Sequence, residues 1–400
     1  MRFIRKRGIP PPPVPTEEDP LPGLRGDPPE LEITRVPGGP FRNILVRMPN
    51  WVGDVVMALP ALRSLRDSYP DSRITILIKP RLFPILEGEP YFDDWIPFRA
   101  KGLRELWRAG RDLAKRRFDL ALVLPNSVSS ALVVTLAGIR PRVGYNLEWR
   151  GTLRLLTHTL PVRKVSGLRR IPMVDYYLAL TYALGCRKAS RRIWFQISDE
   201  LGARADRFLS DAGVGLKERV IGISPGAAFG RSKQWRSDYF AEVADTLARK
   251  YRARILLLCG PGEERVAEDI EESMDEDPIN TARSIIPLDL LKSVVRRCML
   301  LVTTDSGTRH FATGSGVPVV TILGPTFHIY TETEYEKYDF VQNRLECWPC
   351  HRPICPLHHH RCMRDLTPDR VLEACERMLT RFPPRRAGSS PGSSPRFQKS

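Results

Sequence analysis

Residues 43–65, NILVRMPNWVGDVVMALPALRSL, contain the pattern that decides the fold. A nearly unbroken apolar run over residues 43–48 predicts a strand that is buried on both faces, and the stretch at about residues 55–68 has the spacing of an amphipathic helix. The short loop between them, residues 49–54, is typical of a strand-to-helix connection in a parallel sheet.

The same alternation continues along the chain. Further strands are expected at residues 74–79, 95–98, 120–125, 220–225, 253–259, 299–304 and 318–323. Helical patterns at about residues 102–117, 127–137 and 173–184 separate or follow the strands of the first half. Apolar strands separated by helices of ten or more residues indicate parallel sheets covered on both faces. The sequence therefore predicts an α/β fold with two Rossmann-like, doubly wound parallel-sheet domains.

Composition sets the expected domain boundaries. Proline-rich pieces such as PPPP and PGGP predict a disordered arm over residues 1–40, and residues 385–400 resemble a second disordered tail. Between them we expect an N-terminal Rossmann-like domain at 41–195, a linker at 196–216 and a C-terminal Rossmann-like domain at 217–384.

Charge and apolar content indicate which kinds of partner and location to expect. The net charge is +16, and residues 41–200 carry 27 basic and 14 acidic side chains against 29 and 26 in residues 201–400. The first half thus favours an anionic partner, and no recognisable nucleic-acid module accompanies the charge. The chain contains no apolar run long enough for a membrane span, and its basic start runs straight into prolines where a secretory signal needs apolar residues. We expect a cytoplasmic protein.

The loop after the first strand carries a carboxylate. Gly53 allows close backbone approach, and Asp54 stands where ligands of such folds bind, so it is a candidate general base. An aspartate at the start of a helix is also a routine N-cap, and both interpretations stay open.

Three loops of the second half have features of an anion site. Residues 224–235, SPGAAFGRSKQW, join a small-residue loop to Arg231 and Lys233, and residues 304–310, TDSGTRH, lead from a strand into a helix whose first amides favour a phosphate. Residues 259–264 offer a carboxylate to a ribose hydroxyl. A solvated basic loop, a helix cap at Asp305 and a core histidine at His310 are the alternatives. Neither a P-loop nor a full GxGxxG fingerprint occurs.

Together these loops resemble glycosyltransferase family 9, the ADP-heptose:lipopolysaccharide heptosyltransferases. The resemblance covers roughly residues 41–380, and the late cysteine-rich run most resembles the heptosyltransferase II branch. It implies a GT-B architecture, in which two Rossmann-like domains face each other, with the acceptor held mainly by the first and the nucleotide-sugar by the second.

The resemblance also implies site roles. Asp54 matches the general base, Lys233 the lysine that stabilises the departing diphosphate, and Glu264, in preference to its neighbour Glu263, the carboxylate near the ribose. The expected donor-binding residues are Ser224, Gly226, Lys233, Glu264, Asp305, Ser306, Gly307, Thr308 and His310. The expected acceptor-binding residues are Asn50, Trp51, Gly53 and Asn126. Arg309 departs from the family pattern and either adds a phosphate contact or faces solvent.

The implied reaction is inverting transfer of a heptose from ADP-L-glycero-D-manno-heptose to an inner-core heptose of a lipid A-linked acceptor. No metal or cofactor is expected, because a nucleotide diphosphate is already a good leaving group. The implied location is the cytoplasmic face of the inner membrane. A transferase with another nucleotide-sugar donor, and a non-catalytic nucleotide-sugar or membrane-anion binding protein on the same frame, are the alternatives.

The helix expected at 102–117 has an apolar face and a basic face. Its apolar stripe is expected to contain Leu103, Leu106, Trp107, Leu113 and Ala114. Its basic side chains Arg104, Arg108, Arg111 and Lys115 suit either an anionic membrane surface or plain solvent.

The late cysteine-rich run has the ligand types of a zinc site. It contains Cys347, Cys350, Cys355 and Cys362 together with His351, His358, His359 and His360. Only the first cysteine pair has the tight spacing of a zinc knuckle, so reduced thiols and a local disulfide stand beside structural zinc as alternatives.

Overall fold

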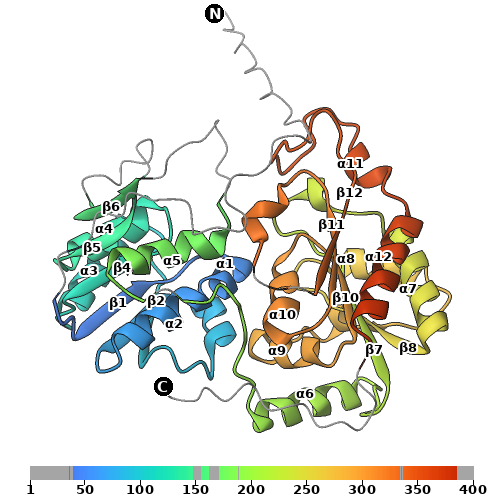
Figure 1. The fold of residues 1–400 in the computed structure, drawn as a ribbon, viewed down its shortest axis with the longest axis horizontal. Helices are drawn as coiled ribbons and strands as arrows, with labels where there is room; N and C mark the ends of the chain where they lie inside the picture. Colours follow the sequence, from blue (N-terminus) through green and yellow to red (C-terminus); the bar gives the residue numbers. More distant parts are fainter. Residues whose placement is uncertain are drawn as a thin grey trace, which may run out of the picture.

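The computed structural model describes residues 36, 39–146, 155–161, 171–187, 189–333, 335 and 337–384, with the backbone alone at 146 and 158–161. These residues form two α/β domains that lie side by side, each built on a six-stranded parallel sheet (Figure 1). The arm predicted at residues 1–40 lies almost entirely outside the described residues, and the tail predicted at 385–400 lies wholly outside them.

The first sheet has the strand order β3-β2-β1-β4-β5-β6. Its strands are β1 (Asn43–Arg47), β2 (Arg73–Ile78), β3 (Asp94–Pro97), β4 (Leu120–Val123), β5 (Arg142–Asn146) and β6 (His158–Pro161). Its helices are α1 (Val52–Met57), α2 (Leu59–Ser68), the 3₁₀ helix η1 (Pro80–Leu86), α3 (Leu103–Ala114), α4 (Val128–Leu136) and α5 (Met173–Ala183). Alternate residues of β1 point to opposite faces, so Ile44 and Val46 pack with α1, α2 and α5, whereas Leu45 packs with α3 and α4.

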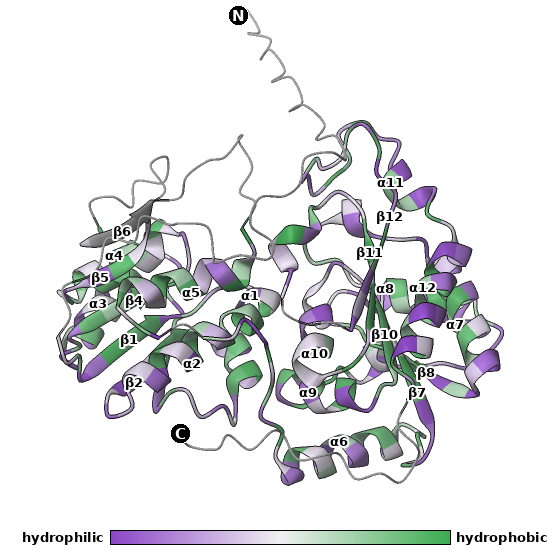
Figure 2. Cartoon of the chain, in the orientation of Figure 1, coloured by the Kyte–Doolittle hydropathy of each residue, from purple (hydrophilic) through white to green (hydrophobic). Residues whose placement is uncertain are grey.

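The second sheet repeats this topology, with the order β12-β11-β10-β7-β8-β9. Its strands are β7 (Arg219–Ser224), β8 (Ala253–Leu257), β9 (Ile279–Asn280), β10 (Leu300–Thr304), β11 (Val319–Leu323) and β12 (Tyr338–Gln342). Its helices are α6 (Asp199–Asp211), η4 (Arg231–Lys233), α7 (Ser237–Tyr251), α8 (Glu264–Glu271), η5 (Thr281–Arg283), α9 (Leu288–Arg296), α10 (Gly307–Ser315), η6 (His328–Thr331), α11 (Arg361–Arg364) and α12 (Pro368–Arg381). Figure 2 shows the strands of this sheet as mainly hydrophobic and the outer helices as mixed.

The doubly wound α/β class predicted from the sequence is confirmed, and every predicted strand is present to within two residues. Four strands were not predicted: β5 and β6 at one side of the first sheet, and β9 and β12 at the two edges of the second. These strands are short or carry polar residues. Three of them, β6, β9 and β12, are edge strands, which do not need to be apolar on both faces, and β5 (RVGYN) contains a charged residue and a glycine. The helix predicted at about 55–68 is divided at Ala58, where Pro60 stands in the first turn of α2.

The segment predicted as a linker, residues 196–216, is mostly the helix α6. It packs against α9 of the second domain through the buried Ala205 and Leu209. Two ion pairs connect the same surfaces, Arg204 Nη2 to Asp289 Oδ2 at 2.8 Å and Arg297 Nε to Asp206 Oδ1 at 3.1 Å.

Helix α3 buries a narrower face than the sequence predicted. Leu106 and Leu113 are buried, but Leu103 and Trp107 are 76% and 54% exposed. The contact with α4 is centred on Gly110, where an added Cβ would lie 2.5 Å from a side-chain atom of α4. Because this close approach fixes the inner face of α3, the two large apolar residues on its first turns stay outside the core.

The two domains meet at two places that matter for the site. The start of α1 touches the start of α10, since a Cβ added at Gly53 would lie 2.7 Å from His310 Cδ2. Elsewhere, Lys292 of α9 and Glu89, just after η1, form an ion pair at 3.3 Å with both side chains fully buried. Lys292 Nζ also donates to the Glu87 carbonyl at 2.7 Å, and the Gln196 amide donates to Glu89 Oε1 at 3.1 Å.

Candidate active site

Asp54 is the carboxylate of the first domain at this junction. Helix α1 begins at Val52 after the N-cap Trp51, so Asp54 is the third helical residue and not the N-cap that the alternative interpretation required. Burial raises the pKa of Asp54 to about 6, and a hydrogen bond from the Tyr177 hydroxyl of α5 partly opposes that rise. At neutral pH the group is therefore mostly ionised and more basic than an ordinary aspartate.

Three of the expected acceptor residues, Asn50, Trp51 and Asn126, lie in loops or at a helix start of the first domain. Asn50 Oδ1 accepts a hydrogen bond of 2.7 Å from Arg47 Nη2, which is buried at the end of β1. Trp51 is 60% exposed, so its ring is free to contact a ligand. Asn126, after β4, donates from Nδ2 to the hydroxyl of Tyr176, the neighbour of Tyr177 on α5.

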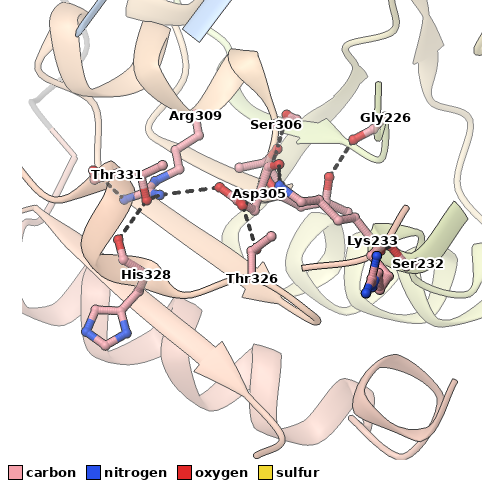
Figure 3. Close-up of polar contacts among 12 residues, drawn as sticks. Gly226, Ser232, Lys233, Asp305, Ser306, Arg309, Thr326, His328 and Thr331 are labelled. Atoms are coloured by element: carbon pink, nitrogen blue, oxygen red, sulfur yellow. Dashed lines mark hydrogen bonds and ion pairs between the residues drawn. The ribbon is translucent and has the colours of Figure 1, made fainter. Parts of the chain in front are cut away.

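Lys233 and Asp305 form the charged centre of the second domain (Figure 3). Lys233 Nζ lies 2.5 Å from Asp305 Oδ2 and 3.2 Å from the Asp305 carbonyl oxygen. The Thr326 hydroxyl donates to Asp305 Oδ2 at 2.8 Å. Burial alone would raise the pKa of Asp305, but the charges of Lys233 and Arg309 outweigh it and hold the pKa well below its usual range. One carboxylate between two cations leaves a net positive charge for an anionic ligand.

Arg309 is the second cation of this centre. Its Nη1 lies 3.6 Å from Asp305 Oδ1, and its side chain is held by Thr331 and stacks on Phe340, with the guanidinium carbon 4.5 Å from the ring centroid. The residue is only 3% exposed. Of the two alternatives for Arg309, the solvent-facing one is therefore excluded, and the phosphate contact stays a prediction.

The expected phosphate-binding turn lies at the start of α10. Ser306 is the N-cap, so Asp305 does not cap this helix, and Gly307 begins it. The first amides of a helix lack partners within the helix, so those of Gly307 and Thr308 suit an anion. His310 is buried against Gly53 of the first domain, and burial together with the charge of Arg309 lowers its pKa to about 3, so it is neutral.

The loop after β7 lies against Glu263, which follows β8. Ser224 is buried at the end of β7, and the Gly226 carbonyl accepts a hydrogen bond from the Thr304 hydroxyl. A Cβ added at Gly226 would lie 2.0 Å from Glu263 Oε1, so the Glu263 carboxylate covers this glycine.

Glu264, by contrast, is exposed at the first position of α8, where its Oε1 accepts 3.0 Å from the Gly262 amide. The structure thus places Glu263, and not Glu264, beside Gly226. The reason is the helix start, since the N-cap Glu263 points back toward β7 while the next residue turns outward.

The late cysteine-rich segment packs against the loop that carries Lys233. The His360 ring Nε2 lies 2.8 Å from the Ser232 carbonyl, and the Ser232 amide donates to the Pro353 carbonyl at 3.0 Å. One small cavity is lined by Cys347, Cys350, Cys355, Cys362, His359 and His360. These cysteines are free thiols, and no three side chains among the described residues are placed to hold a metal ion. The segment's visible role is to support the loop of Lys233.

Two residues near the candidate site, Tyr177 and Thr326, were not named by the sequence analysis, and a third, Glu263, was named only as an alternative. Tyr177 sits in a largely apolar helix, and no spacing marks it as the partner of Asp54. Thr326 follows β11 and reaches Asp305 only through the fold. Glu263 was the one with a signal, because it was already named as the competitor of Glu264.

Comparison with known proteins points to one family. The family model for glycosyltransferase family 9 (heptosyltransferase) matches residues 106–360. Lipopolysaccharide heptosyltransferase 2 of Escherichia coli strain K12 is 28% identical over 350 residues, which cover 84% of this chain and 98% of that protein.

Solved structures of family 9 proteins have a similar fold. The structure of E. coli ADP-heptose lps heptosyltransferase II superposes with a TM-score of 0.69 at 27% identity and covers 85% of this chain and 99% of that one. A family 9 glycosyl transferase from Veillonella parvula gives a TM-score of 0.74 at 22% identity, covering 87% and 99%. The two-domain arrangement is the GT-B architecture. With the family model matching well over half of its residues, the chain belongs to glycosyltransferase family 9.

Proposed function

We propose that this glycosyltransferase moves a heptose from ADP-L-glycero-D-manno-heptose to an inner-core heptose of lipopolysaccharide, with inversion at the anomeric carbon. The family and its curated heptosyltransferase 2 relatives support the donor and the acceptor class. The observation that carries the mechanism is the juxtaposition of α1 and α10, which brings a basic carboxylate, Asp54, toward the cationic centre of Lys233 and Arg309.

Asp54 supplies the base in this mechanism. The acceptor hydroxyl oxygen attacks the anomeric carbon of the donor, and its proton passes to the Asp54 carboxylate. The bond between the anomeric carbon and the diphosphate oxygen breaks, and its electron pair leaves with ADP. A pKa of about 6 suits this task, because the carboxylate is ionised at neutral pH yet holds a proton better than a free aspartate.

The second domain stabilises the leaving group. Lys233 is positioned by Asp305, and it would face the diphosphate together with the first amides of α10. Asp305 therefore acts by orienting Lys233 and not by binding phosphate, since its own charge repels an anion. Glu263, over Gly226, is the carboxylate that we assign to the donor ribose.

The direct test is ADP release from purified protein with ADP-heptose and a heptosyl-Kdo2-lipid A acceptor. We expect turnover that depends on both substrates. Robust turnover of another nucleotide-sugar with none of ADP-heptose would overturn the donor assignment, and no turnover with any donor would favour a non-catalytic binding protein.

We also propose that the protein works at the cytoplasmic face of the inner membrane. The outer surface of α3 supports this, because the exposed Leu103 and Trp107 lie among basic side chains, and the Arg111 guanidinium stacks 4.8 Å from the Trp107 ring centroid. Apolar and aromatic residues beside arginines suit the boundary of an anionic bilayer. Within the described part of the chain, no helix is long and apolar enough to cross a membrane.

A further inference from the structure

A pocket of about 420 Å³ lies at the end of β12, between η6 and the first turns of α12. Its lining includes Phe340, Gln342, Arg344, Arg370, Glu373 and Arg377. The pocket borders the Lys233 and Asp305 centre, since Phe340 also stacks on Arg309, but its arginines and Gln342 make no contact with Lys233 or Asp305.

Two of the three arginines in this pocket lack a neutralising partner. Arg377 is paired with Asp339 Oδ2 at 3.0 Å and lies 3.9 Å from Glu373 Oε2. Arg344 and Arg370 make no ion pair with any carboxylate among the described residues. The pocket therefore has an uncompensated positive charge.

Gln342 holds both of these arginines in place. Arg370 Nη2 donates to the Gln342 carbonyl at 2.8 Å, and Arg344 Nε donates to Gln342 Oε1 at 3.3 Å. The Arg344 guanidinium also lies 4.9 Å from the ring centroid of Trp348. Ordinary surface arginines are free to sample many rotamers, so two guanidiniums fixed around one cavity indicate a prepared site.

The same glutamine offers a donor that nothing in the described structure satisfies. Gln342 Nε2 is buried and has no hydrogen-bond partner among the described residues. A buried amide donor is normally paired, and a turn of the Gln342 side chain toward the cavity would bring this donor to an acceptor that enters the pocket.

We propose that this pocket binds a phosphoryl group, held by Arg344, Arg370 and the Gln342 amide. Guanidiniums bind phosphate through paired charge-assisted hydrogen bonds, and the amide adds a third donor to the same oxygens. The phosphoryl group belongs either to a soluble phosphate ester or to the headgroup of a membrane lipid, and the experiment below separates these sources.

The test uses the full chain and two probes. Glucose 6-phosphate is titrated by calorimetry, and binding to phosphatidylcholine vesicles with and without phosphatidic acid is measured by flotation. Two pocket variants are compared with the unchanged protein, Arg344→Gln with Arg370→Gln, and Gln342→Glu. The second keeps the oxygen that accepts from Arg344 but replaces the unpaired donor with a negative charge. Arg207→Gln with Lys217→Gln removes two exposed charges elsewhere in the second domain and serves as the matched control.

We expect the unchanged protein and the control to bind at least one probe, and both pocket variants to bind it about tenfold more weakly or worse, since each loses charge-assisted contacts. Loss confined to glucose 6-phosphate identifies a soluble ester, and loss confined to vesicles with phosphatidic acid identifies a lipid headgroup. No binding of either probe, or equal binding by the pocket variants and the control, overturns the proposal. Circular dichroism of each variant confirms that it is folded.

Discussion

Two aspartates follow central strands of the two sheets, and their surroundings give them opposite proton affinities. After β1, Asp54 has the neutral hydroxyl of Tyr177 as its partner, and burial raises its pKa to about 6. After β10, Asp305 is even more buried, but Lys233 and Arg309 lower its pKa far below the usual range. Burial alone therefore does not determine the pKa of a carboxylate. Neighbouring charges decide whether the pKa is raised, so that the group can accept a proton near neutral pH, or lowered, so that the group stays ionised.

The largest expected effect comes from removing the base. Asp54→Asn keeps the shape of the side chain but cannot accept the proton, so transfer should fall by about 10²- to 10⁴-fold while ADP binding stays nearly unchanged. Steady-state kinetics and ADP titration check this.

The melting temperature of the same variant also tests whether the pKa of Asp54 is raised in the folded protein. A carboxyl group whose pKa is higher in the folded state than in the unfolded state destabilises the folded state above that pKa. Asp54→Asn should therefore raise the melting temperature at pH 8, and this gain should shrink as the pH falls through about 6 toward 4. Full residual activity would remove Asp54 from its role, and an unchanged melting temperature would contradict the raised pKa.

The next largest effect should come from the cationic side. Lys233→Ala removes a charge-assisted contact worth about 1.5 to 3 kcal/mol, so donor kcat/KM should fall about 10- to 100-fold. Arg231→Ala is the matched control, because Arg231 lies in the same short helix η4 but is exposed. If the two variants behaved alike, Lys233 would be an ordinary surface cation.

A smaller effect is expected from the outer surface of the first domain. Replacing Arg104, Arg108, Arg111 and Lys115 by glutamine should weaken binding to acidic vesicles and lower turnover on a lipid-embedded acceptor severalfold, with little effect on a short delipidated acceptor. Binding by the unchanged protein should weaken with salt, as the Debye length shrinks from about 10 Å at 0.1 M to about 3 Å at 1 M. Equal losses on both acceptors would place these cations at the acceptor itself.

The smallest effect concerns the partner of the base. The Tyr177 hydrogen bond stabilises the ionised form of Asp54, so Tyr177→Phe should raise the pKa of Asp54 further. Because transfer needs the ionised carboxylate, kcat/KM of the unchanged protein should fall as the pH drops through about 6, and the variant should begin its fall at a higher pH, by roughly one unit or less. Tyr182→Phe, elsewhere on α5, should leave the profile unmoved. Identical profiles for all three proteins would show that this hydrogen bond does not tune Asp54.

The fold could be predicted from the sequence because its central strands are buried on both faces and are therefore apolar throughout. Near-continuous apolar runs such as ITILI and LALV, separated by helices of ten or more residues, are typical of buried strands in a parallel sheet. The edge strand β12, YDFVQ, and the short β9 carry no such signal, since their place depends on a neighbouring strand that only the tertiary structure supplies.

The sequence indicated which loops contain the candidate site residues, but it did not indicate which side chains from other elements contact them. Motifs in four loops led to Asp54 and Lys233, whereas Tyr177 is 123 positions away from its partner Asp54 and became visible only when α5 packed beside α1. Which of Glu263 and Glu264 lies beside Gly226 depends on one residue of helix phase, which local patterns do not resolve. The sequence left Arg309 open between a phosphate contact and solvent for a similar reason, because its buried counterion Asp305 is recognised only in the fold.

The buried ion pair between Glu89 and Lys292 limits how the two domains can move. Its two charges come from different domains, and pulling them apart would leave each one unpaired in an apolar setting, at a cost of roughly 3 to 5 kcal/mol. Motions that keep this contact closed avoid that cost. A relative movement of the domains that keeps η1 against α9 is therefore favoured over one that separates them.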